Sequence, residues 1–243
     1  MTRRAPPKGP AAPTAVPTPP AGSTAWYGKL PARGDFVSQG LSPAQVRAWD
    51  GWLQQGLQRA AKRWSPAELD RRLQAFSPWR FLAWPDGPAD VAWAGVLVAS
   101  HDRVGRAFPL MVLQAVEAAR LPQLDWLDIE AALARMADAA LDATDLADPQ
   151  ATEEFEALLL GLGQVFAPER VAARVAMRVP APADAWSARP QQSPLDLLRN
   201  SPGTQSLWWT EPVPGTAPLP LGDTWLPHAE LLLDVLGGGD GAG

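Results

Sequence analysis

Residues 91–100 read VAWAGVLVAS. In a strand, alternate side chains point to opposite faces of the sheet. Both alternating sets of this run are apolar or small up to the final serine, and such a run is typical of a strand that is covered on both faces. The run therefore predicts a central strand with helices packed on both sides of the sheet.

Further strand-like runs flank this central one, WRFLAW at 79–84 and FPLMVLQAV at 108–116. PDGP joins the first pair of runs, and HDRVGRA joins the second. Because links as short as these connect hairpins, this part of the sheet is expected to be antiparallel. Shorter strands are expected at 27–30 and in SLWWTE at 206–211, and alternating valine and arginine over 170–179 favour a solvent-edge strand.

The first helices carry clear start signals. Ser42 is expected to cap a helix that runs to residue 64, with Pro43 at its first position and Gln45 placed to complete a capping box. The sequence SPAE at 65–68 repeats this pattern and predicts a second helix.

Helical periodicity also favours 123–146, 150–162, 194–199 and 226–236, the last with Gly237 as its terminator. Helices that flank a mainly antiparallel sheet in a single α/β domain, an α/β/α sandwich, form the simplest architecture for these elements.

The composition divides the chain into three parts. Residues 1–25 are rich in proline and lack an apolar core for a signal peptide, so we expect a disordered tail and a protein that stays in the cytosol. Residues 26–236 form the expected folded domain. Residues 237–243 read GGGDGAG and predict a flexible end.

The residue counts exclude several kinds of chemistry. The chain has no cysteine and only two histidines, so a thiolate nucleophile or a zinc site is not expected, and we predict neither a metal nor a cofactor. The net charge of −5 disfavours nucleic acid as a partner. No run reaches the roughly 18 apolar residues of a membrane helix, so direct membrane insertion is not expected.

The tripeptide Arg33-Gly34-Asp35 allows three interpretations. An adhesion motif would require an extracellular protein, and an ion pair would lower the carboxylate pKa and leave a poor general base. The third interpretation is a turn, in which Pro31 fixes φ, Gly34 supplies a positive φ and Asp35 bonds nearby amides. The turn is the preferred interpretation.

The sequence Ser100-His101-Asp102 is not a catalytic triad by adjacency, because neighbouring side chains diverge at a strand end. A hairpin loop with Gly105 in a special conformation is preferred. The alternative is a small hydrolase that uses Asp102 or Asp35 together with His101.

Two charged loops remain, one with Arg33 and Asp35 and the other with Asp102, Arg103 and Arg106. If both loops lie at the same end of the sheet, their arginines and aspartates are expected to form a crossed salt-bridge network that fixes the loop geometry. Such an end is also a candidate docking surface.

Five blocks occur in one order: GKLPARGDFV, WDGWLQQGL, WRF, AGVLVASHDRVGRAFPL and SLWWT. Together they resemble the TagF family, also called ImpM, which accompanies type VI secretion systems of Gram-negative bacteria. The resemblance is strong over residues 26–115 and weak at SLWWT. It assigns a loop-structuring role to the motif residues Gly28, Lys29, Pro31, Arg33, Gly34, Asp35, Phe36, Asp102, Arg103, Gly105, Arg106 and Pro109.

The resemblance implies regulation and no catalytic residues. TagF-like proteins repress type VI secretion through the forkhead-associated scaffold protein, which assembles the apparatus at the inner membrane, and a PppA-like phosphatase acts in the same pathway. A structural adaptor that helps assembly is the alternative. Arg103, Arg106, Trp208 and Trp209 are the candidate partner-binding residues, since exposed tryptophan and arginine are enriched at binding hot spots.

Overall fold

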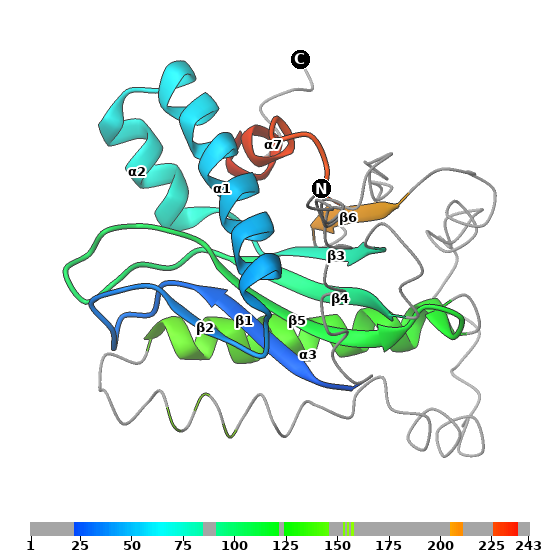
Figure 1. Ribbon diagram of the computed structural model, residues 1–243. Coiled ribbons are helices and arrows are strands. Elements are labelled where there is room, and N and C mark those ends of the chain that lie inside the picture. Colours follow the sequence, from blue (N-terminus) through cyan, green and yellow to red (C-terminus); the bar gives the residue numbers. More distant parts are fainter. Residues whose placement is uncertain are drawn as a thin grey trace, which may run out of the picture.

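A computed structural model describes residues 22–84, 91–121, 124–145, 205–210 and 226–237, together with positions 153, 155 and 157. The described chain forms one antiparallel sheet with helices on both faces (Figure 1), which confirms the predicted α/β class. The strands are β1 (Thr24–Gly28), β2 (Val37–Gln39), β3 (Trp79–Ala83), β4 (Val91–Val98), β5 (Leu110–Glu117) and β6 (Ser206–Thr210); the helices are α1 (Pro43–Arg63), α2 (Pro66–Ala75), α3 (Trp126–Asp145) and α7 (Leu231–Gly237).

The strand β4 lies in the interior of the sheet, whose order is β2-β1-β5-β4-β3-β6. All eight residues of β4 are buried, and both of its neighbours pair with it antiparallel. The central position predicted from VAWAGVLVAS is therefore confirmed, as are the two hairpin partners β3 and β5.

Two separate apolar cores lie on the two faces of the sheet. Trp93 and Leu97 of β4 belong to the core that α1, α2 and α7 cover, whereas Ala94 and Val96 belong to the core beneath α3. Figure 1 shows the same division, with α3 alone on its side of the sheet among the labelled helices. The period-2 alternation of β4 thus supplies both cores at once.

The helix start signals are confirmed in detail. The Ser42 hydroxyl accepts the backbone N–H of Gln45, and the Gln45 side chain accepts the N–H of Ser42, which completes the capping box of α1. Ser65 caps α2 in the same way through the N–H of Glu68. These bonds satisfy amides that a helix start otherwise leaves without partners.

Some predicted boundaries were wrong. The strand β1 begins at Thr24, so the last two residues of the predicted tail belong to the sheet, and it ends at Gly28 instead of reaching residue 30. The last helix, predicted from 226, begins at Leu231. The PDGP link, the strand 170–179, the helix 194–199 and, apart from three helical positions, the helix 150–162 lie outside the described residues.

Gly95 leaves room for an aromatic stack beside β4. It pairs with Phe81 across the sheet, and the Phe81 ring stacks on Trp208 with centroids 4.5 Å apart. A β-carbon at Gly95 would lie 2.4 Å from the Phe81 ring and 2.7 Å from the Val112 carbonyl oxygen. Neither the packed ring nor the backbone oxygen can move away without disturbing the core.

Gly95→Ala is expected to lower the free energy of unfolding by about 1–3 kcal/mol, because overpacking a closed core forces strain on its neighbours. Gly51→Ala is the matched control, since a β-carbon on that α1 glycine would have no atom within 4 Å. This control should gain up to about 1 kcal/mol from helix propensity. Urea unfolding of both variants measures the difference. Equal stabilities would contradict the packing argument.

Candidate functional site

The loop after β1 turns sharply at Leu30–Arg33. The N–H of Arg33 donates to the Leu30 carbonyl oxygen at 2.9 Å, and Pro31 occupies the second position of this turn, which suits its fixed φ. The preferred turn interpretation of this segment is therefore confirmed. Two details were wrong, because the glycines with positive φ among the described residues do not include Gly34, and Asp35 accepts no hydrogen bond from a described residue.

The β4–β5 hairpin is shaped by Asp102 and Gly105. Gly105 has φ +81°, the special conformation expected of it. The Asp102 carboxylate accepts the N–H of Val104 at 3.1 Å and that of Arg106 at 2.9 Å. Binding of loop amides was predicted for Asp35, but among the described residues Asp102 does this, because it lies inside its own turn.

A buried ion pair joins the two loops. The Lys29 ammonium lies 3.0 Å from the Asp102 carboxylate, and the two residues are 8% and 1% exposed. The Arg106 guanidinium also contacts Asp102, with Nε 2.6 Å from the carboxylate. Buried charges of this kind are tolerated only when they are paired and hydrogen-bonded, so Lys29 and Asp102 depend on each other.

Backbone contacts complete the connection between the loops. The N–H of Arg103 donates to the Arg33 carbonyl oxygen at 2.8 Å, and Arg106 Nη2 donates to the Gly34 carbonyl oxygen at 3.0 Å. The Ser100 hydroxyl donates to the Lys29 carbonyl oxygen at 2.7 Å. The two loops therefore lie together at one end of the sheet, which was the condition for the expected salt-bridge network.

The predicted network of salt bridges between the arginines and aspartates of the two loops named the wrong partners. Asp102 pairs with Lys29 and Arg106 and not with Arg33, and Asp35 forms no ion pair with a described residue. The reason is burial: the Lys29 side chain follows the end of β1 inward to Asp102, whereas Arg33 and Asp35 lie exposed beyond the turn.

Gly28, at the end of β1, and Pro109, just before β5, determine how closely these two strands approach each other. A β-carbon on Gly28 would lie 2.3 Å from the Pro109 carbonyl oxygen, and its φ of +149° also favours glycine. The motif residues Gly28 and Pro109 thus belong to one close backbone contact, which brings Lys29 to the β4–β5 hairpin.

The chemistry of Asp102 does not suit a general base. Burial by itself raises the pKa of its carboxyl, but four hydrogen bonds, led by that from the N–H of Arg106, outweigh this effect and hold the pKa well below its ordinary value. His101 forms no hydrogen bond to Asp102 or Asp35, and its buried Nδ1 has no partner among the described residues. The pairing that a hydrolase would require is therefore not assembled here.

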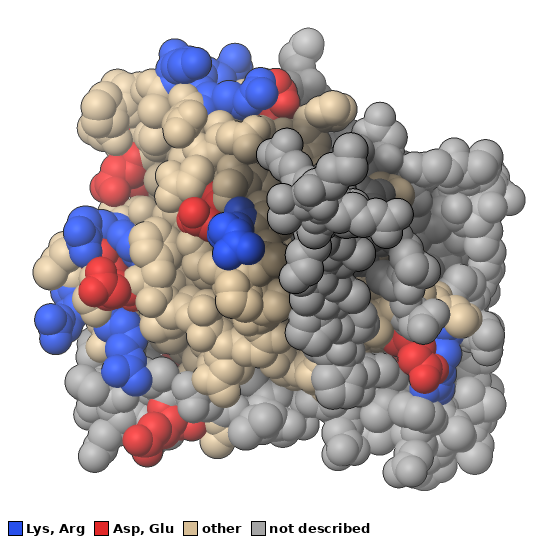
Figure 2. Space-filling view, in the orientation of Figure 1, with Lys and Arg blue, Asp and Glu red and all other residues tan. Residues whose placement is uncertain are grey.

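The outer face of the two loops is exposed and mixes charge with apolar side chains. Phe36 is 45% and Val104 68% exposed, although both are large hydrophobic residues. Figure 2 shows Lys, Arg, Asp and Glu side chains gathered at the left edge of the molecule, where these loops project. We call the exposed residues of this face the loop-end surface; they are Arg33, Asp35, Phe36, Arg103, Val104 and Arg106.

Phe36 is held in place although it is exposed. Its ring stacks on Tyr27 with centroids 5.8 Å apart and meets Phe108 edge-on at 4.7 Å. Tyr27 in turn donates to Asp50 of α1, and burial together with this carboxylate raises the pKa of the Tyr27 phenol. The loop-end surface is thus anchored to the core and to α1. Sequence reasoning missed Val104, whose only signal was one apolar residue inside a charged hairpin loop.

Trp208 and Trp209 do not lie on an exposed surface. They are 0% and 2% exposed, because helices cover both faces of the sheet where β6 pairs with β3. Trp209 donates from its indole N–H to Glu130 of α3 at 2.6 Å, and Trp208 lies in the opposite core. The prediction that Trp208 and Trp209 are exposed was therefore wrong, and their predicted partner-binding role depended on it.

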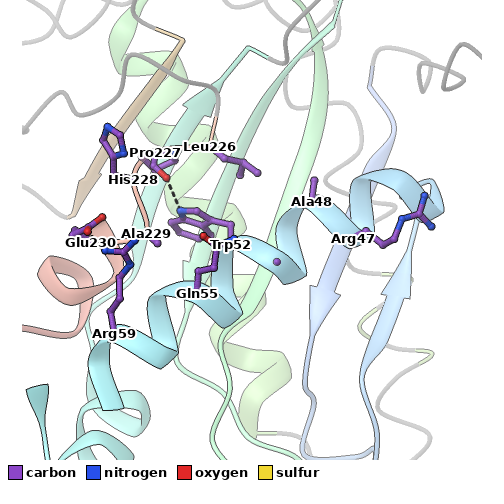
Figure 3. Close-up of a pocket in the computed structure, with 11 residues that line it drawn as sticks. Arg47, Ala48, Trp52, Gln55, Arg59, Leu226, Pro227, His228, Ala229 and Glu230 are labelled. Atoms are coloured by element: carbon purple, nitrogen blue, oxygen red, sulfur yellow. Dashed lines mark hydrogen bonds and ion pairs between the residues drawn. The ribbon is translucent and has the colours of Figure 1, made fainter. Parts of the chain in front are cut away.

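A shallow cavity of about 420 Å³ lies between α1 and residues 226–230. Figure 3 shows that the side chains on its two walls already contact each other. Trp52 donates to the Pro227 carbonyl oxygen at 2.8 Å, and Arg59 pairs with Glu230. These contacts hold the segment before α7 against α1, so we interpret the cavity as part of the structural packing between these two segments.

No three His, Asp or Glu side chains in the described ranges gather as metal ligands. None of the helices in that part of the chain is both long and apolar enough to cross a membrane.

Comparison with known proteins gives a family and a similar solved structure. Residues 25–160, more than half of the chain, match the family model described as TagF N-terminal domain, type VI secretion system-associated. The crystal structure of PA0076 from Pseudomonas aeruginosa PAO1 is similar over 91% of this chain and 97% of its own, with 26% identity and a TM-score of 0.58. No curated protein matches significantly.

The chain is therefore a protein associated with type VI secretion. It belongs to the TagF family, through the TagF N-terminal domain. The resemblance inferred from the five sequence blocks is confirmed.

Asp102 should make stability depend on acid. Because its folded pKa lies below the unfolded value of about 3.9, the charged carboxylate stabilises the fold above that value, and this contribution is lost as the pH falls from about 5. Asp102→Asn should therefore lower the urea midpoint at about pH 7 and reduce the further loss between about pH 7 and pH 3.5.

Asp138→Asn, an exposed substitution on α3, is the control and should follow the wild type. An acid loss in Asp102→Asn as large as that of the wild type would contradict the role given to this carboxylate.

Proposed function

We propose that this protein is a non-enzymatic repressor of type VI secretion that binds the forkhead-associated scaffold protein through the loop-end surface. One observation carries the proposal: an exposed set of arginine and large apolar side chains lies on a support of buried, hydrogen-bonded polar groups. Arginine and aromatic residues are enriched at binding hot spots, and a pre-organised loop loses little conformational freedom on binding.

The internal bonding of the loops supports binding over catalysis. Lys29 and Asp102, the two buried charged residues here, bind each other and the hairpin backbone. An active site needs a nucleophile, a base and an orienting group that converge on a reacting atom. The hydrolase alternative with His101 therefore has less support than a binding role.

The cellular setting follows from the same proposal. The protein acts in the cytoplasm of a Gram-negative bacterium and reaches the inner membrane through its partner. A PppA-like phosphatase acts in the same pathway. A structural adaptor that promotes assembly would need the same kind of surface, so the direction of the effect on secretion separates the two roles.

Deleting the gene in its native bacterium is expected to increase effector release, because a repressor that acts by contact would be lost. Immunoblotting of a secreted effector in the medium measures this, with a cytoplasmic protein as the lysis control. Complementation with the wild-type gene should restore the low level. A fall in effector release on deletion would instead favour the assembly adaptor.

The surface itself can be tested with the purified scaffold protein. Phe36→Ala combined with Arg103→Ala is expected to weaken binding about tenfold or more, since truncating hot-spot residues costs at least about 1.4 kcal/mol in total. Leu127→Ala combined with Arg63→Ala is the matched control, because Leu127 is similarly exposed at 46% and Arg63 is exposed at the end of α1. Calorimetry measures both. Equal affinity of the two double variants would place the interface elsewhere.

A further inference from the structure

The loop-end surface has a charge opposite to that of the whole chain. Lys29, Arg33, Arg103 and Arg106 carry positive charge in the two loops, against two carboxylates, whereas the chain as a whole carries −5. One carboxylate, Asp102, is buried beneath the surface and faces Lys29. The exposed side is therefore dominated by guanidinium groups, and a partner of complementary charge is acidic.

Arg103 has donors available for a partner. Its backbone N–H is engaged by Arg33, but its guanidinium forms no hydrogen bond or ion pair with any residue in the described ranges. Arg106 is different, since its Nε contacts Asp102 and its Nη2 contacts Gly34. The Arg106 guanidinium is thus already bonded to the two loops, whereas the Arg103 guanidinium can donate to a partner.

The backbone around these arginines cannot supply a phosphate cradle. The N–H groups of Val104 and Arg106 donate to Asp102, and that of Gly105 donates to the Asp102 carbonyl oxygen. Backbone N–H groups that converge form the phosphate-binding concavities of proteins, whereas a single guanidinium can bind a carboxylate through two parallel N–H groups. Here the hairpin amides and the Lys29 ammonium are already used internally, so the remaining donors suit separate carboxylates spread over an open surface.

Apolar contact area accompanies these charges. Val104 follows Arg103 directly and is 68% exposed, and Phe36 offers a fixed ring, with the Lys29 ammonium 5.3 Å from its centroid on the protein side. A binding segment would therefore gain from an apolar side chain between its acidic residues, because both ring and valine lose exposed area on contact.

We propose that the loop-end surface docks an unphosphorylated acidic segment of a partner protein, in which aspartate or glutamate side chains bind Arg103 and Arg106 and an apolar side chain contacts Phe36 or Val104. This inference rests on the proposed function in one respect, that the surface binds a protein. It adds the chemistry that the partner must present.

Photo-crosslinking in the native bacterium tests this chemistry without assuming which protein is bound. The full chain carries p-benzoylphenylalanine in place of Val104, and a second form carries it in place of Leu127 of α3, an exposed hydrophobic residue outside the two loops, as the control. Mass spectrometry should find, at position 104 alone, a partner segment rich in Asp and Glu without phosphate. A phosphorylated segment, a segment without acidic residues, or no crosslink at position 104 would overturn the proposal.

A charge test completes the experiment. Arg103→Glu should reduce the crosslink at position 104 about tenfold, since it sets like charges opposite each other, while Arg63→Glu should leave it unchanged. Raising salt from about 50 mM to about 300 mM in a lysate should weaken the crosslink by screening. If neither Arg103→Glu nor added salt reduces the crosslink at position 104, the proposal that the partner segment is acidic is wrong. If the crosslinked segment is acidic but belongs to a protein other than the scaffold protein, only the proposed function is contradicted.

Discussion

The burial of β4 on both faces constrains the rest of this structure. A strand with no solvent face requires a helical layer on each side, and its two alternating side-chain sets supply both cores. At one end of the sheet, β1 and β4 pass into the two loops. Polar groups that enter the sheet end must be satisfied by each other, because no water reaches them from the faces.

The ion pair of Lys29 with Asp102 satisfies the buried polar groups at this end of the sheet. One carboxylate binds an ammonium from the first loop, a guanidinium from its own hairpin and two hairpin amides. The same bonds that satisfy the buried charges also fix the relative position of two loops far apart in the chain, since the bonded partners are separated by 71 and 73 residues. Stability and surface shape therefore have one origin in this part of the molecule.

The motif residues divide between this buried support and the surface that we propose to bind a partner. Gly28, Lys29, Pro109 and Asp102 lie beneath it and determine its shape. The exposed positions, among them Phe36, Arg103 and Val104, provide the contact area. The sequence motif therefore covers both the support and most of the side chains that the support presents, and within the loop-end surface Val104 is the residue outside it.

The sequence alone determined the fold class, the hairpins around β4 and the starts of α1 and α2, because these depend on local periodicity and on caps that act over three or four residues. It placed the charged loops of Arg33 and Asp102 at strand ends and left open whether they share one end of the sheet. Only the tertiary structure decided that Lys29 pairs with Asp102, that Asp35 stays exposed, and that both Trp208 and Trp209 are buried. Those outcomes depend on which helices cover each face of the sheet and on the close approach of Gly28 to Pro109. Both are contacts between segments far apart in the chain, and no local sequence pattern encodes such distances.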